Sequence, residues 1–492
     1  MTERSHTPQD VAVIGGRVLR DGRSATAVAI RDGRILLVGD DAEVRDAIGA
    51  DAEVVDAEGG TILPGFDDAH THVLSGALLR GALALSTDDD LGAVRAVIAE
   101  YAARTSGWII GTGWHYRAFG GGTPTRQLLD ELVGARPAYI TAFDGHTSWV
   151  STAALRLAGV TASTPDPEGG TIERDAAGEP TGILREKASA LIHPVLERPR
   201  GADVLPFAAD AMRELAAMGI TSVQDPGSSP DELPLWAALR ERGELTVRAR
   251  LGLPLPVDAD DAELARTLDD YSGLVADTAD DIWIAGGTLK GFLDGVIETR
   301  TAALLEPYRA LSASGDAFID PERLTRLVIA ANSRAWQVQL HAIGDRAVRI
   351  ALDAYEAARR AGGRRIANRV EHIELCDPAD LPRFGSLGVV ASLQPLHAFC
   401  DAERVEAWDG LVGPQRSDLA WPAAQILAAG GTVALGSDWP VADCDPLAVI
   451  RAAVMQSNLH VGGRAEPSNA LTMGDALSAY GEGGAAAADV QV

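Results

Sequence analysis

The sequence predicts an α/β fold, in which a (β/α)8 TIM-like barrel follows a small N-terminal β module. Short apolar runs alternate with segments of helical spacing from about residue 203 onward, which is typical of parallel strands joined by helices. Ionisable residues follow the ends of several of these runs, where a barrel carries its chemistry. A series of short apolar runs and turns before residue 65 predicts the separate β module.

Residues 1–64 are predicted to form the β module. The apolar runs 27–30 and 35–39 flank the pair Asp32-Gly33. An Asp-Gly pair between two apolar runs is a strong hairpin signal, because both residues tolerate the backbone conformation of a two-residue turn. We therefore expect an antiparallel hairpin at this point.

The barrel is predicted over residues 65–455. Residues 206–218 have apolar side chains at helical spacing, and residues 220–223 follow as a strand. The strand 338–340 and the helix 345–359 belong to the same alternation. Strands that alternate with helices in this way imply a parallel sheet.

Two segments depart from the alternation. Residues of about 104–200 are rich in glycine and less regular, and we expect them to form an insertion near the active-site face. The segment 456–492 ends in a tail of small residues, and we expect it to be a truncated C-terminal return.

Composition and charge exclude several kinds of partner. The net charge of −27, from 43 basic and 70 acidic residues, opposes binding to nucleic acid or to an anionic membrane. The three cysteines are widely separated, so a disulfide framework is not expected. The first residues have no apolar signal core, and no apolar run approaches the length of a membrane span. We therefore expect a cytoplasmic protein.

His70 and His72 are the most informative pair in the sequence. Residues two apart on an extended segment project to the same face, so both imidazoles can reach one metal ion. Imidazole is a good zinc ligand. The pair alone is a weak motif, and a metal site therefore requires further ligands at later strand ends.

Four more ionisable residues lie at such strand ends, namely Lys290, His341, His372 and Asp438. A protonated lysine cannot ligate a metal, but burial near cations favours the neutral amine, which can react with CO2 to give an anionic carbamate. An aspartate beside a metal-activated water can ligate the ion and accept the proton. The set predicts a divalent metal, with zinc as the first candidate, bound as one or two ions.

Short motifs occur in a fixed order along this part of the chain. They occupy residues 63–72, 144–149, 169–172, 178–182, 289–295, 340–345, 369–372 and 436–440. In content and order they resemble the amidohydrolase superfamily, in the branch of YtcJ-like proteins and N-substituted formamide deformylases (amidohydrolase family 3).

This resemblance implies a metal-bearing barrel beside a β-sandwich. By position it assigns His70 and His72 as ligands of one ion and His341 and His372 as ligands of another. It assigns Lys290 as a carbamylated bridge between the ions and Asp438 as the catalytic aspartate. Chains of this branch usually add strands after the barrel that complete the β-sandwich. Those strands are missing here, so we expect an incomplete module.

Four further residues are candidates for substrate binding. His146 either stabilises an oxyanion or makes a structural hydrogen bond. His397 either lines the substrate pocket or belongs to a loop. Trp114 and Trp439 either line an apolar pocket or are core residues.

The predicted function is hydrolysis of a C–N bond in a small amide or formamide by metal-activated water. Two alternatives stay open. The same chemistry attacks esters and lactones, and the motifs do not separate these carbonyl compounds. A non-catalytic binding protein that keeps the fold is the other alternative. The expected partner is a small-molecule substrate, and a second copy of the chain is a further candidate.

Overall fold

The chain divides into two compact units, residues 1–66 and 67–492. The computed structural model describes residues 10–19, 25–86, 89–142, 147–167, 170–196, 201–276, 281–298, 300–309, 312–362, 366–398, 408–455 and 469–488. Within the described residues, no helix is long and apolar enough to cross a membrane.

The first unit is β-rich. Its larger sheet has the order β4-β3-β1-β5, and it also contains a two-stranded sheet and one helix. The elements are β1 (Val11–Ile14), β2 (Arg17–Val18), β3 (Ala27–Arg31), β4 (Arg34–Gly39), α1 (Asp41–Ile48), β5 (Glu53–Asp56) and β6 (Thr61–Ile62). The predicted hairpin is present: Arg31 pairs with Arg34, and Asp32 and Gly33 between them both have positive φ. This is the conformation that a two-residue hairpin turn requires.

The second unit contains the predicted barrel. Eight strands form one sheet in the order β20-β19-β18-β17-β16-β15-β14-β7. They are β7 (Phe66–Asp68), β14 (Ile220–Asp225), β15 (Arg248–Pro254), β16 (Ile284–Phe292), β17 (Gln337–Ala342), β18 (Arg369–His372), β19 (Val390–Leu393) and β20 (Thr432–Leu435). Successive strands from β14 to β20 pair in parallel. The amide of Ala69 donates to the carbonyl of Leu435 (3.1 Å), so the last strand meets the first.

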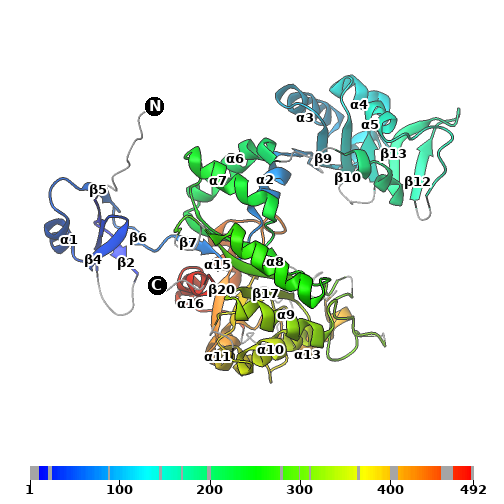
Figure 1. The fold of residues 1–492 in the computed structure, drawn as a ribbon. Coiled ribbons are helices and arrows are strands. Elements are labelled where there is room, and N and C mark those ends of the chain that lie inside the picture. Colours follow the sequence, from blue (N-terminus) through cyan, green and yellow to red (C-terminus); the bar gives the residue numbers. More distant parts are fainter. Residues whose placement is uncertain are drawn as a thin grey trace. The chain divides into compact units, whose positions relative to one another are not determined.

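Helices follow these strands and lie outside the sheet (Figure 1). They include α2 (Val73–Gly81), α6 (Leu205–Ala217), α7 (Leu233–Glu241), α8 (Asp261–Leu274), α9 (Pro321–Ser333), α10 (Asp345–Arg360), α11 (Leu381–Leu387), α14 (Ala423–Ala428) and α15 (Pro446–Met455). The apolar faces of these helices and the strands form the core, as Leu340, Val348 and Leu352 show by being fully buried. This packed core holds the carboxyl ends of the strands in place, and in a parallel barrel the functional site lies at these ends.

The segment between α2 and α6 is more ordered than its glycine content suggests. It forms a six-stranded sheet, and it begins before residue 104. Its elements are β8 (Leu83–Ala84), α3 (Leu91–Arg104), β9 (Ile109–Trp114), α4 (Arg126–Val133), β10 (Ala138–Ala142), β11 (Thr147–Val150), α5 (Thr152–Leu157), β12 (Gly170–Arg174) and β13 (Pro180–Glu186). Glycine here marks close packing, because a Cβ added at Gly111 would lie 2.5 Å from the carbonyl oxygen of Leu83.

The C-terminal residues also have a defined structure. They form α16 (Met473–Ala479) and α17 (Glu482–Ala487). The side-chain amides of Gln224 and Gln337 donate to the carbonyls of Gly484 (2.7 Å) and Ala487 (2.8 Å). A tail of small residues therefore packs directly against the barrel strands.

Candidate metal centre

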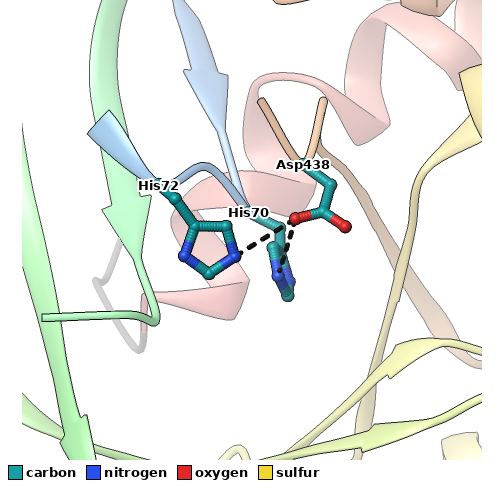
Figure 2. Close-up of side chains that lie close together, drawn as sticks. All are labelled: His70, His72 and Asp438. Atoms are coloured by element: carbon teal, nitrogen blue, oxygen red, sulfur yellow. Dashed lines mark ion pairs between the residues drawn. The ribbon is translucent and has the colours of Figure 1, made fainter. Parts of the chain in front are cut away.

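The loops after β7 and β20 bring His70, His72 and Asp438 together. The amide of Asp438 donates to the carbonyl of His70, and the amide of His72 donates to the carbonyl of Trp439, each at 2.7 Å. In this arrangement Oδ1 of Asp438 lies 3.5 Å from Nε2 of His70 and 3.2 Å from Nε2 of His72 (Figure 2). These backbone hydrogen bonds thus hold the two loops so that both imidazoles lie next to the same carboxylate oxygen of Asp438.

The other oxygen of Asp438 faces a second pair of imidazoles. His372 ends β18, and His397 ends the short 3₁₀ helix Pro395–His397 that follows β19. Oδ2 of Asp438 lies 4.0 Å from Nδ1 of His372 and 3.8 Å from Nε2 of His397. The two rings are nearly parallel, with an interplanar angle of 13° and centroids 6.1 Å apart.

Lys290 and His341 complete the predicted ligand set. Lys290 lies in β16 and is buried, with Nζ 5.1 Å from the ring centroid of Phe292. The ring of His341 lies 4.4 Å from that of His372. Nε2 of His341 lies 3.5 Å from the carbonyl oxygen of Gly295, to which it can donate a hydrogen bond when it carries the proton. All six residues therefore lie at one end of the barrel sheet.

Burial controls the charge of these side chains. It lowers the pKa of His70 to about 4 and that of His341 to about 3, and the Lys290 ammonium adds to both shifts. Burial also holds the pKa of His372 well below its ordinary value. These imidazoles are neutral near pH 7, which is the form that ligates metal. Burial lowers the pKa of Lys290 to about 8, which increases its share of neutral amine.

The donor set fits a divalent metal. The ligand atoms of His70, His72 and Asp438 all lie within 4.8 Å of one another, and so do those of His372, His397 and Asp438. Two neutral imidazoles and a carboxylate are a typical zinc donor set. Within the described residues, Nδ1 of the buried His372 also has no hydrogen-bond partner, which an ion would remedy.

Sequence reasoning missed the residues that hold His70. Its Nδ1 lies 2.5 Å from Oε2 of Glu371, and Oε1 of Glu371 lies 2.9 Å from Nε of Arg369. All three side chains are buried. A signal was available, since Arg369 and Glu371 are charged residues two apart on a strand and therefore share its inward face with no solvent to stabilise them.

Two of the substrate-binding candidates, Trp114 and Trp439, are buried side chains. Trp114 is fully buried in the core of the inserted sheet, and its indole N–H donates to the carbonyl of Ile140 (3.0 Å). Of the two roles considered for Trp114, this position is that of a core residue. Trp439 is buried beside α2, where a Cβ added at Gly76 would lie 2.5 Å from its ring. His146 lies outside the described residues.

Comparison with known proteins agrees with this architecture. The amidohydrolase family model matches residues 53–491. Protein LONG AFTER FAR-RED 3 from Arabidopsis thaliana is 32% identical over 490 residues, covering 96% of this chain and 82% of that protein. An N-substituted formamide deformylase from Arthrobacter pascens is 29% identical over 489 residues, covering 96% of this chain and 88% of that protein.

A solved structure shows the same fold. An uncharacterized metal-dependent hydrolase from Pyrococcus furiosus superposes with a TM-score of 0.77 at 24% identity, covering 97% of this chain and 94% of that one. The resemblance that the ordered motifs indicate is thereby confirmed. Because the family model and the relative at 32% identity both extend over most of its length, the chain belongs to the amidohydrolase family.

Proposed function

We propose that this chain is a metal-dependent hydrolase that cleaves the C–N bond of a small amide or formamide. One observation carries the proposal: a buried aspartate, Asp438, lies between two pairs of histidines at the strand ends of the barrel. In a parallel barrel this end is where catalytic groups gather.

His70, His72 and Asp438 would hold a divalent ion, with zinc as the first candidate. When bound, such an ion supplies Lewis acidity, which polarises a carbonyl group and makes water a stronger acid. Lys290 is proposed to act as a carbamate, since its buried amine with a lowered pKa can react with CO2. The negative charge of the carbamate would offset the positive charge of one or two metal ions.

Asp438 is the proposed proton shuttle. Burial alone opposes its ionisation, but the imidazoles of His70 and His72 lower the pKa of this carboxyl to about 2. The group therefore waits as a carboxylate and can accept a proton from the attacking water. It then returns that proton to the nitrogen of the leaving amine, which would otherwise depart as an unstable anion.

An ester or lactone would meet the same water at its carbonyl carbon. The amide assignment is supported by the relative named as a formamide deformylase, at 29% identity over nearly the whole chain. A binding protein that keeps the fold is less well supported, because all the ligand side chains of the proposed site are present and close together.

A substrate panel separates these proposals. Zinc-loaded and manganese-loaded protein would be assayed on N-formyl amines, N-acyl amines, lactams, esters and lactones. We expect turnover of the N-formyl or N-acyl compounds. Turnover of esters or lactones alone would replace the C–N assignment, and an inert, metal-loaded protein would favour a binding role.

A further inference from the structure

We propose that Phe292 determines substrate specificity at the candidate metal centre by binding an apolar group of the substrate, above all an aromatic ring. Phe292 is the last residue of β16. The inference rests on the proposed function, because it concerns the same site, and it adds the class of amide that this site takes.

The geometry places the ring of Phe292 at the mouth of the barrel. Residues two apart on a strand project to the same face, so Phe292 shares a face of β16 with the buried Lys290. Nζ of Lys290 lies 5.1 Å from the centroid of the Phe292 ring. Phe292 also pairs with His341 across β16 and β17, and these two rings lie 5.4 Å apart. The ring of Phe292 therefore lies beside two of the proposed ligands, nearer to the end of the strand than Lys290.

The reacting groups lie close to this ring. The ring of His341, which is 5.4 Å from that of Phe292, is 4.4 Å from that of His372. Nδ1 of His372 in turn lies 4.0 Å from Oδ2 of Asp438, the proposed proton shuttle. Two imidazole rings thus separate Phe292 from Asp438. A small amide whose nitrogen lies next to Asp438 can therefore extend a substituent to Phe292.

Phe292 is accessible to a ligand. It is 52% exposed, whereas the inward side chains of a parallel barrel are normally buried against one another. Two more exposed apolar residues lie on loops that carry the site. Phe318 is 60% exposed and its amide donates to the carbonyl of Leu293 (2.7 Å), and Val441 is 71% exposed and its amide donates to the carbonyl of Asp438 (2.8 Å). Exposed apolar side chains gathered at one site are typical of a binding surface.

The chemistry of this side chain selects the kind of substituent. A phenylalanine ring binds another aromatic ring by offset stacking or edge-to-face contact, which adds to the gain from burying apolar surface. It has no hydrogen-bonding group, so a polar substituent would lose its water without compensation. The observations therefore favour an amide with an aryl substituent, attached either to the nitrogen or to the carbonyl carbon.

Matched pairs of amides test the inference on the zinc-loaded full chain. N-benzylformamide and N-methylformamide differ on the nitrogen, whereas N-methyl-2-phenylacetamide and N-methylacetamide differ on the carbonyl carbon. In one of these pairs we expect the wild type to prefer the aryl compound by about 10–200-fold in kcat/KM. Phe292→Ala is expected to bring this ratio close to one, and Phe292→Tyr, which keeps the ring, is expected to retain it. Both members of a pair are assayed on one preparation, so a loss of bound metal or of folded protein cancels in the ratio.

Leu274→Ala is the matched control, because it also truncates a half-exposed apolar side chain, at the end of α8. This control should keep the wild-type ratio. If Phe292→Ala does not fold, Phe292→Leu makes the comparison, since leucine is apolar but has no ring. A wild type without an aryl preference in either pair would overturn the inference. So would an undiminished preference in Phe292→Ala, which would leave Phe292 as a cation–π partner of the Lys290 ammonium.

A failure of the proposed function gives a different result. If the zinc-loaded protein hydrolyses none of the four amides, the Kd of each is measured by calorimetric titration, which needs no turnover. The inference then predicts tighter binding of an aryl compound than of its methyl partner, and loss of this difference in Phe292→Ala. Equal binding of both members of each pair to the wild type would overturn it.

Discussion

Oε2 of Glu371 lies 2.5 Å from Nδ1 of His70, and this contact determines which imidazole nitrogen faces Asp438. A carboxylate on one nitrogen holds the proton there and leaves the other nitrogen, Nε2, as a lone-pair donor. Arg369 holds the carboxylate in turn, with Nε 2.9 Å from Oε1, and its guanidinium donates to the carbonyl of Ala69 (2.6 Å). The metal ligand is thus fixed from behind by a buried ion pair.

We predict that Glu371→Gln weakens zinc binding by about 10–100-fold, because such supporting carboxylates orient the ligand and make it more basic. The change also leaves the Arg369 charge buried without its partner, at a cost of about 3–5 kcal/mol in the free energy of unfolding. Competition with a chelator measures the zinc affinity, and chemical denaturation measures the stability.

Glu374→Gln is a matched control for that variant. Burial holds the pKa of Glu374 well above its ordinary value, which favours the neutral acid that glutamine mimics. This control is expected to bind zinc as the wild type does. Wild-type zinc affinity in Glu371→Gln would show that the carboxylate does not position His70.

Asp438→Asn is predicted to lower kcat by about 10²–10⁴-fold, because the amide cannot shuttle a proton between water and the leaving nitrogen. The fold should be unchanged, as judged by circular dichroism. Asp443→Asn changes an exposed carboxylate five residues further along, and it should leave kcat within about twofold. Full activity in Asp438→Asn would refute its role as the shuttle.

Lys290→Ala is predicted to lose both bound metal and hydrolysis, since it removes the amine that forms the proposed carbamate. Adding a short carboxylic acid should restore part of the activity, because its carboxylate can occupy the vacated space. Bound metal and initial rates would be measured with and without the acid. Unaltered metal content in the variant counts against a bridging carbamate.

Gly483→Ala is predicted to destabilise the protein by about 1–3 kcal/mol, because an added Cβ would collide with the carbonyl oxygen of Val433. Gly273→Ala is the control: it lies in α8, and a Cβ there meets no atom within 4 Å. The control should be neutral or more stable by up to about 1 kcal/mol, since alanine favours a helix. Equal melting temperatures for both variants would contradict the close packing of α17.

The barrel and its strand-end ligands were predictable because short apolar runs alternate regularly with segments of helical spacing, and ionisable residues follow several of these runs. Alternating strands and helices fix a parallel sheet, and parallel strands place their carboxyl ends on one edge, so His70, His341 and Asp438 meet there. The hairpin at Asp32-Gly33 was predictable for a local reason, since few residue pairs tolerate two positive φ values.

Other features depend on contacts that the local sequence does not encode. The glycines of the inserted sheet suggested irregular structure, but at Gly111 the reason is the close approach of Leu83. The small residues of the C-terminal tail did not indicate that α17 packs against the barrel strands, because those contacts come from residues far away in the sequence. The sequence also could not reveal that His397 faces Asp438, because the direction of a loop side chain is set by its tertiary neighbours.

Metal dependence of amide hydrolysis tests the central claim most directly. One protein preparation would be assayed on a panel of N-substituted formamides as purified, after removal of metal by a chelator, and after return of Zn²⁺. The account predicts hydrolysis that the chelator abolishes and zinc restores. Hydrolysis that survives complete removal of metal, or its absence from a protein that binds zinc stoichiometrically, would contradict the account.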